Sequence, residues 1–395
     1  MVNKKISVCH VTPEISKAGG GVATYVWDLA ERALDYGINA SVLGQDSLGD
    51  PSLPIANKNI AVHILDRLGP RSMSYLPRLK NTIFKMKPDI IHAHGLRMWP
   101  IYGAMCVAKK NKMPFVLSMH GMMTPALLQQ RKFKKQIAYQ LFDRQTLKHT
   151  NLIHATSAME LEHIRNFGCK NPVIVLPIGC DIPQAPKASA INAWRDRFSE
   201  LKNKRVLLYL SLIHHKKGLL RLIDTWAKLS EKYSDWHLLI AGPDHQNHLI
   251  QIKEAIRKTK TQKSITLAGP LYGAEKNIAY QQAQAFVLHS DWENFGIVIA
   301  EALAGGLPVI TSDQTPWQII NQKKCGWWIP LKIEALEHTL AQALALSADA
   351  LNQKGQNAIQ LIKEDYAWPG VYEQLQSGYE WLLGNGPKPA AVDMI

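Results

Sequence analysis

The chain has little cysteine, no long apolar run and no low-complexity tract. Its 395 residues include five cysteines, which are scattered, odd in number and without any CxxC pair. This usage argues against a disulfide scaffold and a structural zinc site, and favours reduced thiols in a cytosolic protein. No apolar run approaches the roughly 18–20 residues that span a bilayer, and the one near the N-terminus is too short for a signal peptide. The sequence therefore predicts a protein that is soluble or peripheral to a membrane.

Acidic residues are scarce in the first half of the chain. Residues 1–182 contain 23 Lys+Arg against 12 Asp+Glu, a net charge of +11, whereas residues 183–395 contain 23 against 20, a net charge of +3. A basic half indicates an anionic partner, which is nucleic acid, a phosphate-bearing ligand or an anionic membrane surface. Residues 131–144 interleave basic residues with Phe133, Ile137, Leu141 and Phe142 at near-helical spacing. That pattern is typical of a solvated helix face or of a helix on a membrane surface.

Short apolar strands alternate with helical segments along both halves of the chain. The expected strands of the first half are residues 5–13, 38–45, 88–95, 114–121, 151–157 and 173–179. Those of the second half are residues 205–212, 236–243, 264–270, 283–290 and 308–313. This alternation predicts an α/β protein with two doubly wound, Rossmann-like domains in tandem, each with a parallel sheet covered by helices.

A segment rich in proline and alanine, residues 180–190, marks the boundary between the two halves. We predict a domain over residues 1–182, a linker over residues 183–203 and a second domain over residues 204–368. A last helix, over about residues 369–384, precedes a tail of residues 385–395 that we expect to be frayed. Ligands of open parallel sheets bind at the carboxyl ends of the strands, so the residues just after the strands are the informative ones.

The first half offers a glycine loop and three histidines. Gly19–Gly21 lie between the first strand and the first helix, where a backbone without side chains and free helix N–H groups favour an anion. The loop is a poor dinucleotide fingerprint because Thr24 stands where a third glycine is expected, and a tight turn is the alternative. His120 ends a strand, where it suits a ligand or a structural role. His92 and His94 face one way along another strand, but with no third ligand nearby we predict no metal site.

A basic loop follows the first strand of the second half. It contains His214, His215, Lys216 and Lys217, and Gly218 then opens a helix. Lysines at the start of a helix oppose its macrodipole unless an anion is bound there. The loop therefore indicates a diphosphate site, with a solvated basic loop as the alternative.

Two glutamates flank the apolar segment ENFGIVIAE. Glu293 falls in the loop after a strand and Glu301 falls in the following helix, roughly 8–12 Å away at about 1.5 Å per residue. That distance argues against an acid–base pair and for two anchor points on the hydroxyl groups of one elongated ligand. Free N–H groups near Gly296 and Ile297 would hold an anion between them.

The ordered series of these segments resembles glycosyltransferase family 4, which consists of retaining enzymes with the GT-B fold. The resemblance covers nearly the whole chain, and no single segment carries it. Its carriers are AGGGVATYVWDLA, DIIHAHG, MHG at 119–121, LPIGCD, HKKGL, IAGPD, LAGPLYG, the E-x7-E of 293–301 with the following ALAGGLPVI, TPW and CGWW. It implies two tandem Rossmann-like domains facing a central cleft, with the last helix packing back on the first domain.

The resemblance also implies roles for individual residues. It assigns catalytic roles to Glu293, near the reacting face of the donor sugar, to His120, and to Lys217, which would neutralise the departing diphosphate. Glu301 would bind the ribose hydroxyls of the donor. The other implied donor-binding residues are Phe295, Gly296, Ile297 and Val298, through their backbone, together with Gly20, Gly21, Lys216 and His214.

The activity that the resemblance implies is transfer of a sugar from a nucleotide diphosphate sugar, with retention of configuration and without a metal or another cofactor. We expect a saccharide acceptor, lipid-linked, in surface polysaccharide or lipopolysaccharide biosynthesis. We expect a cytoplasmic location, and the basic first domain indicates a peripheral contact with the cytoplasmic face of the inner membrane as a further option. No sequence motif supports binding of nucleic acid.

Two positions depart from the family pattern. Leu212 stands where the family usually has an arginine that clamps the diphosphate, and His214, His215 or Lys216 are the candidates to supply the missing charge. The segment LHSD at 288–291 lacks the proline that more often precedes the serine. Leu212 keeps open a non-catalytic protein that binds sugar nucleotides or serves in assembly. A nicotinamide-dependent enzyme would require the dinucleotide fingerprint that the chain lacks.

Overall fold

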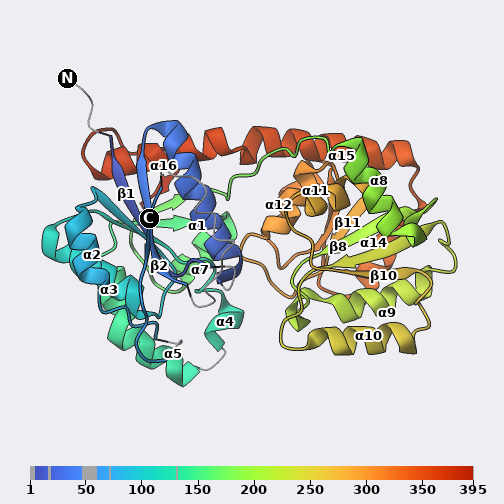
Figure 1. The fold of residues 1–395 in the computed structure, drawn as a ribbon, viewed down its shortest axis with the longest axis horizontal. Coiled ribbons are helices and arrows are strands. Elements are labelled where there is room, and N and C mark those ends of the chain that lie inside the picture. Colours follow the sequence, from blue (N-terminus) through green and yellow to red (C-terminus); the bar gives the residue numbers. More distant parts are fainter. Residues whose placement is uncertain (1–4, 17–18, 47–59, 71–72, 130–131, 395) are drawn as a thin grey trace. The chain divides into compact units, whose positions relative to one another are not determined.

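The computed structural model describes residues 5–16, 19–46, 60–70, 73–129 and 132–394. The chain forms two compact units (Figure 1). Unit 1 consists of Met1–Gly179 together with Trp368–Ile395, and unit 2 consists of Cys180–Ala367. The chain therefore leaves unit 1 once and returns to it for its last helix.

Unit 1 is built on an eight-stranded sheet in the order β14-β7-β6-β5-β4-β1-β2-β3. All neighbouring strands are parallel except β14, which runs antiparallel to β7. The order reverses at β1, which lies between β2 and β4, so the ends of β1 and β4 mark the switch point of the sheet. The strands are β1 (Ser7–Glu14), β2 (Asn39–Gln45), β3 (Ala61–Ile64), β4 (Ile90–His94), β5 (Phe115–Ser118), β6 (Leu152–Ala155), β7 (Val173–Val175) and β14 (Val392–Asp393).

Helices cover the sheet of unit 1. The first, α1, buries Tyr25, Val26 and Leu29 at helical spacing. The last, α16, packs on α1 and η2, where Tyr36 and Tyr372 stack with ring centroids 4.6 Å apart. The helices of the unit are α1 (Gly20–Ala33), η2 (Leu34–Tyr36), α2 (Leu79–Met86), α3 (Trp99–Asn111), α4 (Pro125–Gln129), α5 (Lys132–Ala138), η3 (Tyr139–Asp143), α6 (Arg144–Lys148), α7 (Ala158–Asn166) and α16 (Trp368–Leu382).

Val392 and Asp393, after α16, pair with the sheet, so the prediction of a frayed tail is wrong for these residues. Val392 pairs with Ile174 of β7 as part of β14. The guanidinium of Arg165 also donates to the Asp393 carboxylate, with Nη2 and Oδ2 2.5 Å apart. The sequence of the tail did not reveal this pairing, because the strand has only two residues.

Unit 2 has a six-stranded, all-parallel sheet in the order β10-β9-β8-β11-β12-β13. Its switch point lies between β8 and β11. The strands are β8 (Arg205–Leu210), β9 (Trp236–Ala241), β10 (Ile265–Gly269), β11 (Ala285–Leu288), β12 (Val309–Ser312) and β13 (Gly326–Ile329). The helices are α8 (Ala188–Arg197), η4 (Ser199–Leu201), η5 (His215–Lys217), α9 (Leu219–Leu229), α10 (His248–Lys258), α11 (Gly273–Gln282), α12 (Ile297–Ala304), α13 (Ile319–Gln322), α14 (Ile333–Ala345), α15 (Ala348–Leu361) and η6 (Ile362–Tyr366).

The predicted fold class, two α/β domains with parallel sheets, is confirmed by these two units. The predicted linker over residues 183–203 is not a linker, because it contains α8 and η4 and belongs to unit 2. Within α8, Trp194 is buried and its ring lies 4.4 Å from that of Phe198, which anchors the segment. Among the described residues, no helix is long and apolar enough to cross a membrane.

Candidate functional site

The predicted residues of the second half gather at the switch point of unit 2. The loop after β8 leads into η5, which holds Lys216 and Lys217, and the loop after β11 holds Glu293. The two loops are joined directly, since the Asp291 N–H donates to the Lys216 carbonyl at 2.7 Å. The strand-end rule therefore places this group of residues correctly.

Lys217 and Glu293 form an ion pair at the centre of this group. Their side chains are only 11% and 9% exposed, and Ser290 Oγ donates to the same carboxylate oxygen at 2.8 Å. Gly218 follows Lys217 with φ +70°, and a Cβ there would meet the carbonyl oxygen of His289. A side chain at Gly218 would thus push the two loops apart.

Lys216 and His214 differ in the charge that they can offer. Burial and the neighbouring Lys217 lower the pKa of Lys216, whose Nζ lies 4.0 Å from the ring centroid of Trp292. Burial and the adjacent cations lower the pKa of His214 to about 4. Its Nδ1 accepts a hydrogen bond from the Lys216 N–H at 3.2 Å. His214 is therefore neutral at pH 7 and does not supply the positive charge that the expected arginine would carry at position 212.

Glu301 lies on α12 with partners of its own. Its Oε1 accepts from Lys276 Nζ at 2.5 Å and its Oε2 accepts from Tyr280 OH at 2.9 Å. The side chain of Glu301 is 22% exposed and that of Lys276 is 27% exposed. Lys276 and Tyr280 were missed from the sequence, although their i, i+4 spacing on α11 puts both on one helix face. Burial, with Glu301 second, raises the pKa of Tyr280 well above its usual value, so its hydroxyl is a donor.

The start of α12 lies between the two glutamates in the chain. Gly296 caps the helix with φ +81°, and no side chain caps it. The N–H groups of Ile299 and Ala300 donate to the Gly296 carbonyl, while those of Ile297 and Val298 have no acceptor in the described part of the chain. Phe295 is buried against Trp317, whose Nε1 donates to the Phe295 carbonyl at 2.5 Å. Two free N–H groups thus point out of the helix end and suit an anion.

Arg221, on the first turn of α9, was also missed from the sequence. Its Nη2 donates to the His289 carbonyl at 2.9 Å and to Asp291 Oδ1 at 2.6 Å. The position of the expected arginine, Leu212, is apolar, and the Leu212 carbonyl accepts from Tyr209 OH at 3.3 Å. Arg221 is therefore a cation near the loop that follows β8, but the carboxylate of Asp291 already neutralises it.

The remaining predicted residues lie in unit 1. Gly20 and Gly21 are exposed at the start of α1, and Gly20 adopts a left-handed φ of +58°. His120 follows β5, also with a left-handed φ, of +51°. The Glu160 carboxylate fixes this turn, because its Oε1 accepts from the Gly121 N–H at 2.6 Å.

The expectation that His92 and His94 have no third possible ligand nearby is wrong. His10, on β1, lies beside them, and ring nitrogens of the three side chains all lie within 4.8 Å of one another. Hydrogen bonds nevertheless account for His92, because Tyr379 OH lies 2.7 Å from its Nδ1 and Ser118 Oγ lies 2.8 Å from its Nε2. With both nitrogens engaged, His92 has no free lone pair for a metal in this arrangement.

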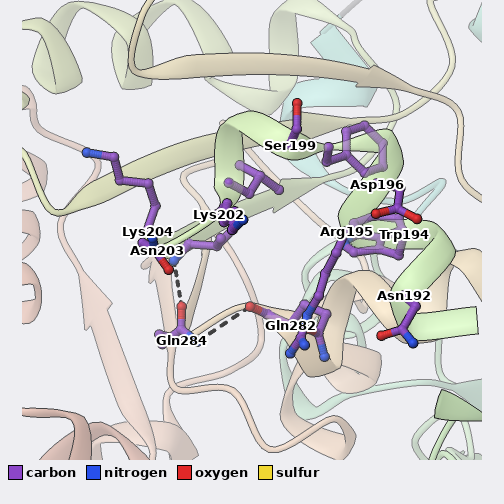
Figure 2. Close-up of a pocket in the computed structure, with 13 residues that line it drawn as sticks. Asn192, Trp194, Arg195, Asp196, Ser199, Lys202, Asn203, Lys204, Gln282 and Gln284 are labelled. Carbon is purple, nitrogen blue, oxygen red and sulfur yellow. Dashed lines mark hydrogen bonds between the residues drawn. The ribbon is translucent and has the colours of Figure 1, made fainter. Parts of the chain in front are cut away.

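A cavity of about 760 Å³ lies elsewhere in unit 2 and contains none of the predicted residues (Figure 2). It is bounded by α8, the start of β8, and Gln282 and Gln284. Of its three cations, Arg195 faces Gln282 at 3.4 Å and Lys204 Nζ donates to the Ser234 carbonyl at 2.6 Å. The cavity sits at the amino end of β8, opposite to the strand ends that hold the candidate site, so we do not assign the donor to it.

Comparison with known proteins finds glycosyltransferases for both halves of the chain. A family described as "Glycosyl transferases group 1" matches residues 191–361, and one described as "Glycosyltransferase Family 4" matches residues 19–184. The GDP-mannose:cellobiosyl-diphosphopolyprenol alpha-mannosyltransferase of Xanthomonas campestris is 24% identical over 393 residues, which cover 98% of this chain and 100% of that protein. The phosphatidyl-myo-inositol mannosyltransferase of Mycobacterium tuberculosis is 24% identical over 220 residues, 54% of this chain and 56% of that protein.

Solved structures share the fold. HepE of Anabaena, in complex with UDP and glucose, superimposes with a TM-score of 0.78 at 15% identity and covers 95% of this chain and 100% of its own. At that identity the likeness concerns the fold alone.

Proposed function

The chain belongs to glycosyltransferase family 4, has the GT-B fold and transfers glycosyl groups, and on that premise we propose a retaining, metal-independent transfer from a nucleotide diphosphate sugar to a lipid-linked glycan. The observation that carries the proposal is the arrangement at the switch point of unit 2. There Lys217, Glu293 and the open end of α12 come from loops that follow neighbouring strands.

In the proposed reaction the bond between C1 of the sugar and the diphosphate breaks while an acceptor hydroxyl attacks C1 from the same face. The hydroxyl proton passes to the departing diphosphate oxygen. Lys217 and the free N–H groups of Ile297 and Val298 stabilise the negative charge that grows on the diphosphate. Glu301 binds the ribose hydroxyls in exchange for Lys276, and Glu293 contacts the donor sugar, as the family resemblance implies. For His120, in unit 1, the resemblance implies a catalytic role.

The acceptor is the less constrained part of the proposal. Two relatives act, by their names, on a diphosphopolyprenol-linked sugar and on phosphatidyl-myo-inositol, so we propose a lipid-linked acceptor for this chain too. The segment formed by α5 and η3 supports contact with an anionic membrane face, because it exposes Phe133, Ile137 and Leu141 at 76%, 46% and 57%. Large exposed apolar side chains at helical spacing beside basic residues are typical of helices that lie on membranes.

The test uses the full-length protein with a panel of UDP and GDP sugars and a diphosphopolyprenol-linked saccharide, in the presence of EDTA. We expect transfer with one donor, a product whose anomeric configuration equals that of the donor, and loss of transfer in Glu301→Ala. An inverted product, or activity that EDTA abolishes and Mg²⁺ restores, would overturn the proposed chemistry. Binding of a sugar nucleotide without turnover across the panel would instead favour the non-catalytic alternative that Leu212 keeps open.

A further inference from the structure

Five histidines line one face of the sheet in unit 1. His10 on β1 is in register with His92 on β4, His94 follows two residues later, and His154 lies on β6. Side chains two residues apart in a strand point to the same face, and so do those of residues in register. His120 comes two residues after Ser118, which is in register with both His94 and His154. Nothing assigned above explains why so many imidazoles are buried together.

Two of these histidines belong to a hydrogen-bond chain whose direction is fixed at its end. His154 Nε2 must donate to the Leu176 carbonyl, 3.0 Å away, because a carbonyl only accepts. Burial lowers the pKa of His154 to about 4, so the ring is neutral and its Nδ1 accepts from Ser118 Oγ at 3.1 Å. Ser118 in turn accepts from His92 Nε2, and His92 Nδ1 accepts from Tyr379 OH. This chain ties α16 to the sheet.

The other three histidines form a second chain that ends at a predicted site residue. His10 Nδ1 lies 3.1 Å from His94 Nε2, and His94 Nδ1 lies 3.1 Å from His120 Nε2. At the inner end, His10 Nε2 is buried and has no hydrogen-bond partner. At the outer end, His120 Nδ1 has no partner in the described part of the chain. Burial lowers the pKa of His10 and of His120 to about 3, so the rings are neutral at pH 7.

Three neutral imidazoles can satisfy both hydrogen bonds in only two ways, because each ring has one N–H and one lone pair. In the outward arrangement each Nδ1–H donates toward His120, and the buried His10 Nε2 keeps a lone pair. In the inward arrangement each Nε2–H donates toward His10, whose own Nε2–H is then buried without an acceptor. In the protein backbone, orphaned buried N–H groups are rarer than under-satisfied carbonyl oxygens. Applied to the ring of His10, the same preference favours the outward arrangement.

We propose that His10 and His94 are positioning residues that hold His120 as the Nδ1–H tautomer, so that the neutral ring of His120 presents an N–H group to an oxygen of a substrate. The oxygen is a sugar hydroxyl or a phosphate oxygen, both of which accept. The contact of His120 with a substrate rests on the proposed function, whereas the tautomer itself does not. The bond from the Gly121 N–H to Glu160 holds the turn that carries the ring.

The direct test is the tautomer of His120 in full-length protein labelled with ¹⁵N-histidine. Long-range ¹⁵N–¹H correlation spectra at pH 7.5 distinguish Nδ1–H from Nε2–H rings, and His120→Gln and His94→Gln identify the signals. We expect His120 and His94 both protonated at Nδ1, and a mixture of His120 tautomers in His10→Leu. His120 protonated at Nε2, or a His120 tautomer unchanged in His10→Leu, would overturn the proposal. So would a stoichiometric divalent metal that the purified protein loses in His10→Leu.

Kinetics then connects the tautomer to the reaction. We expect His10→Leu to lower kcat about tenfold with little change in the donor KM, since about 1.4 kcal/mol of transition-state stabilisation corresponds to a factor of ten. His10→Asn, which keeps an N–H donor, should recover most of the loss. The matched control is His237→Leu, which removes another buried histidine, on β9, whose Nε2 lies 2.9 Å from Thr266 Oγ1.

The outcomes separate the two proposals. Suppose that wild-type protein transfers no sugar while His120 carries its proton on Nδ1 and changes its tautomer in His10→Leu. In that case the proposed function fails, and the assignment of His10 and His94 as residues that fix the His120 tautomer stands. If transfer is found and His10→Leu, His10→Asn and His237→Leu lower kcat equally, the positioning role is refuted.

Discussion

Replacing Lys217 with methionine tests the centre of the candidate site. The substitution keeps most of the aliphatic volume and removes the charge that pairs with Glu293. If Lys217 stabilises the departing diphosphate, its loss should act on kcat more than on the donor KM, because the charge on the leaving group grows only in the transition state.

The expected size follows from the surroundings of the pair. Removing one preorganised charged contact to a developing oxyanion costs about 10²–10³ in kcat, or about 2.7–4 kcal/mol. Stability should fall as well, because Glu293 is 9% exposed and, of its side-chain hydrogen-bond partners among the described residues, would keep Ser290 alone. Breaking a buried ion pair from one side costs about 3 kcal/mol. Loss of fold and loss of chemistry must therefore be separated.

A double variant separates them. Lys217→Met with Glu293→Gln removes the uncompensated carboxylate, so its urea midpoint should return toward that of wild type while transfer stays low. Lys228→Met serves as the control, because Lys228 pairs with Glu337 on the exposed surface of the same unit and should change neither property. A Lys217→Met enzyme that keeps kcat within about threefold of wild type, a change below about 0.7 kcal/mol, would refute the assignment.

Three further predictions concern other parts of the molecule. Glu301→Gln should raise the donor KM about tenfold or more, because a neutral amide binds ribose hydroxyls more weakly than a carboxylate does. Isothermal titration with the nucleotide diphosphate measures this loss, and an unchanged Kd would contradict the prediction. Replacing Phe133, Ile137 and Leu141 by serine should abolish sedimentation of the protein with vesicles rich in anionic lipid. The unfolding midpoint should not change, because these side chains are exposed. Undiminished binding to the vesicles would exclude α5 and η3 as the membrane-contacting segment. The free energy of unfolding should fall as the pH drops below 6.5, because histidines of the unfolded chain then bind protons that the buried histidines of the folded chain do not. It should fall by about 1.36 kcal/mol per pH unit for each such histidine. A urea midpoint that stays flat between pH 7.5 and 5 would contradict this prediction. In the sheet of unit 1, burial lowers the pKa values of His10 and His120 to about 3 and that of His154 to about 4, and it lowers those of His92 and His94 well below their usual value.

Much of the candidate site could be predicted because strand ends are visible in the sequence. A short apolar run followed by polar residues and glycine fixes both the strand and the point where its side chains reach a ligand. That reasoning found Lys217 and Glu293, which the structure joins in one ion pair. It also found Gly296, whose left-handed conformation opens α12.

The partners that complete the site could not be predicted, because they come from helices and strands distant in sequence. Lys276 reaches Glu301 from a separation of 25 residues, and His10 reaches His94 from one of 84. Periodicity reports which residues share a face of their own element, not which face meets another element. The same limit explains α8, where the composition suggested a linker and tertiary packing of Trp194 produced a helix.

The ion pairs around the candidate site show which cation is left unpaired where Leu212 replaces the arginine that the family usually has. Lys217, Arg221 and Lys276 each hold a carboxylate, on Glu293, Asp291 and Glu301. These three pairs sum to zero, so a diphosphate that enters must exchange partners with them or find charge elsewhere. Within the described residues, Lys216 is the lysine of this loop that forms no ion pair, and burial together with Lys217 lowers its pKa more than the charge of Glu293 raises it. An anion bound there would relieve that penalty. Under the proposed function the loop would thus keep one cation available for the diphosphate where the family arginine is absent, and the free N–H groups of α12 would supply the remaining contacts without the cost of burying a second charge.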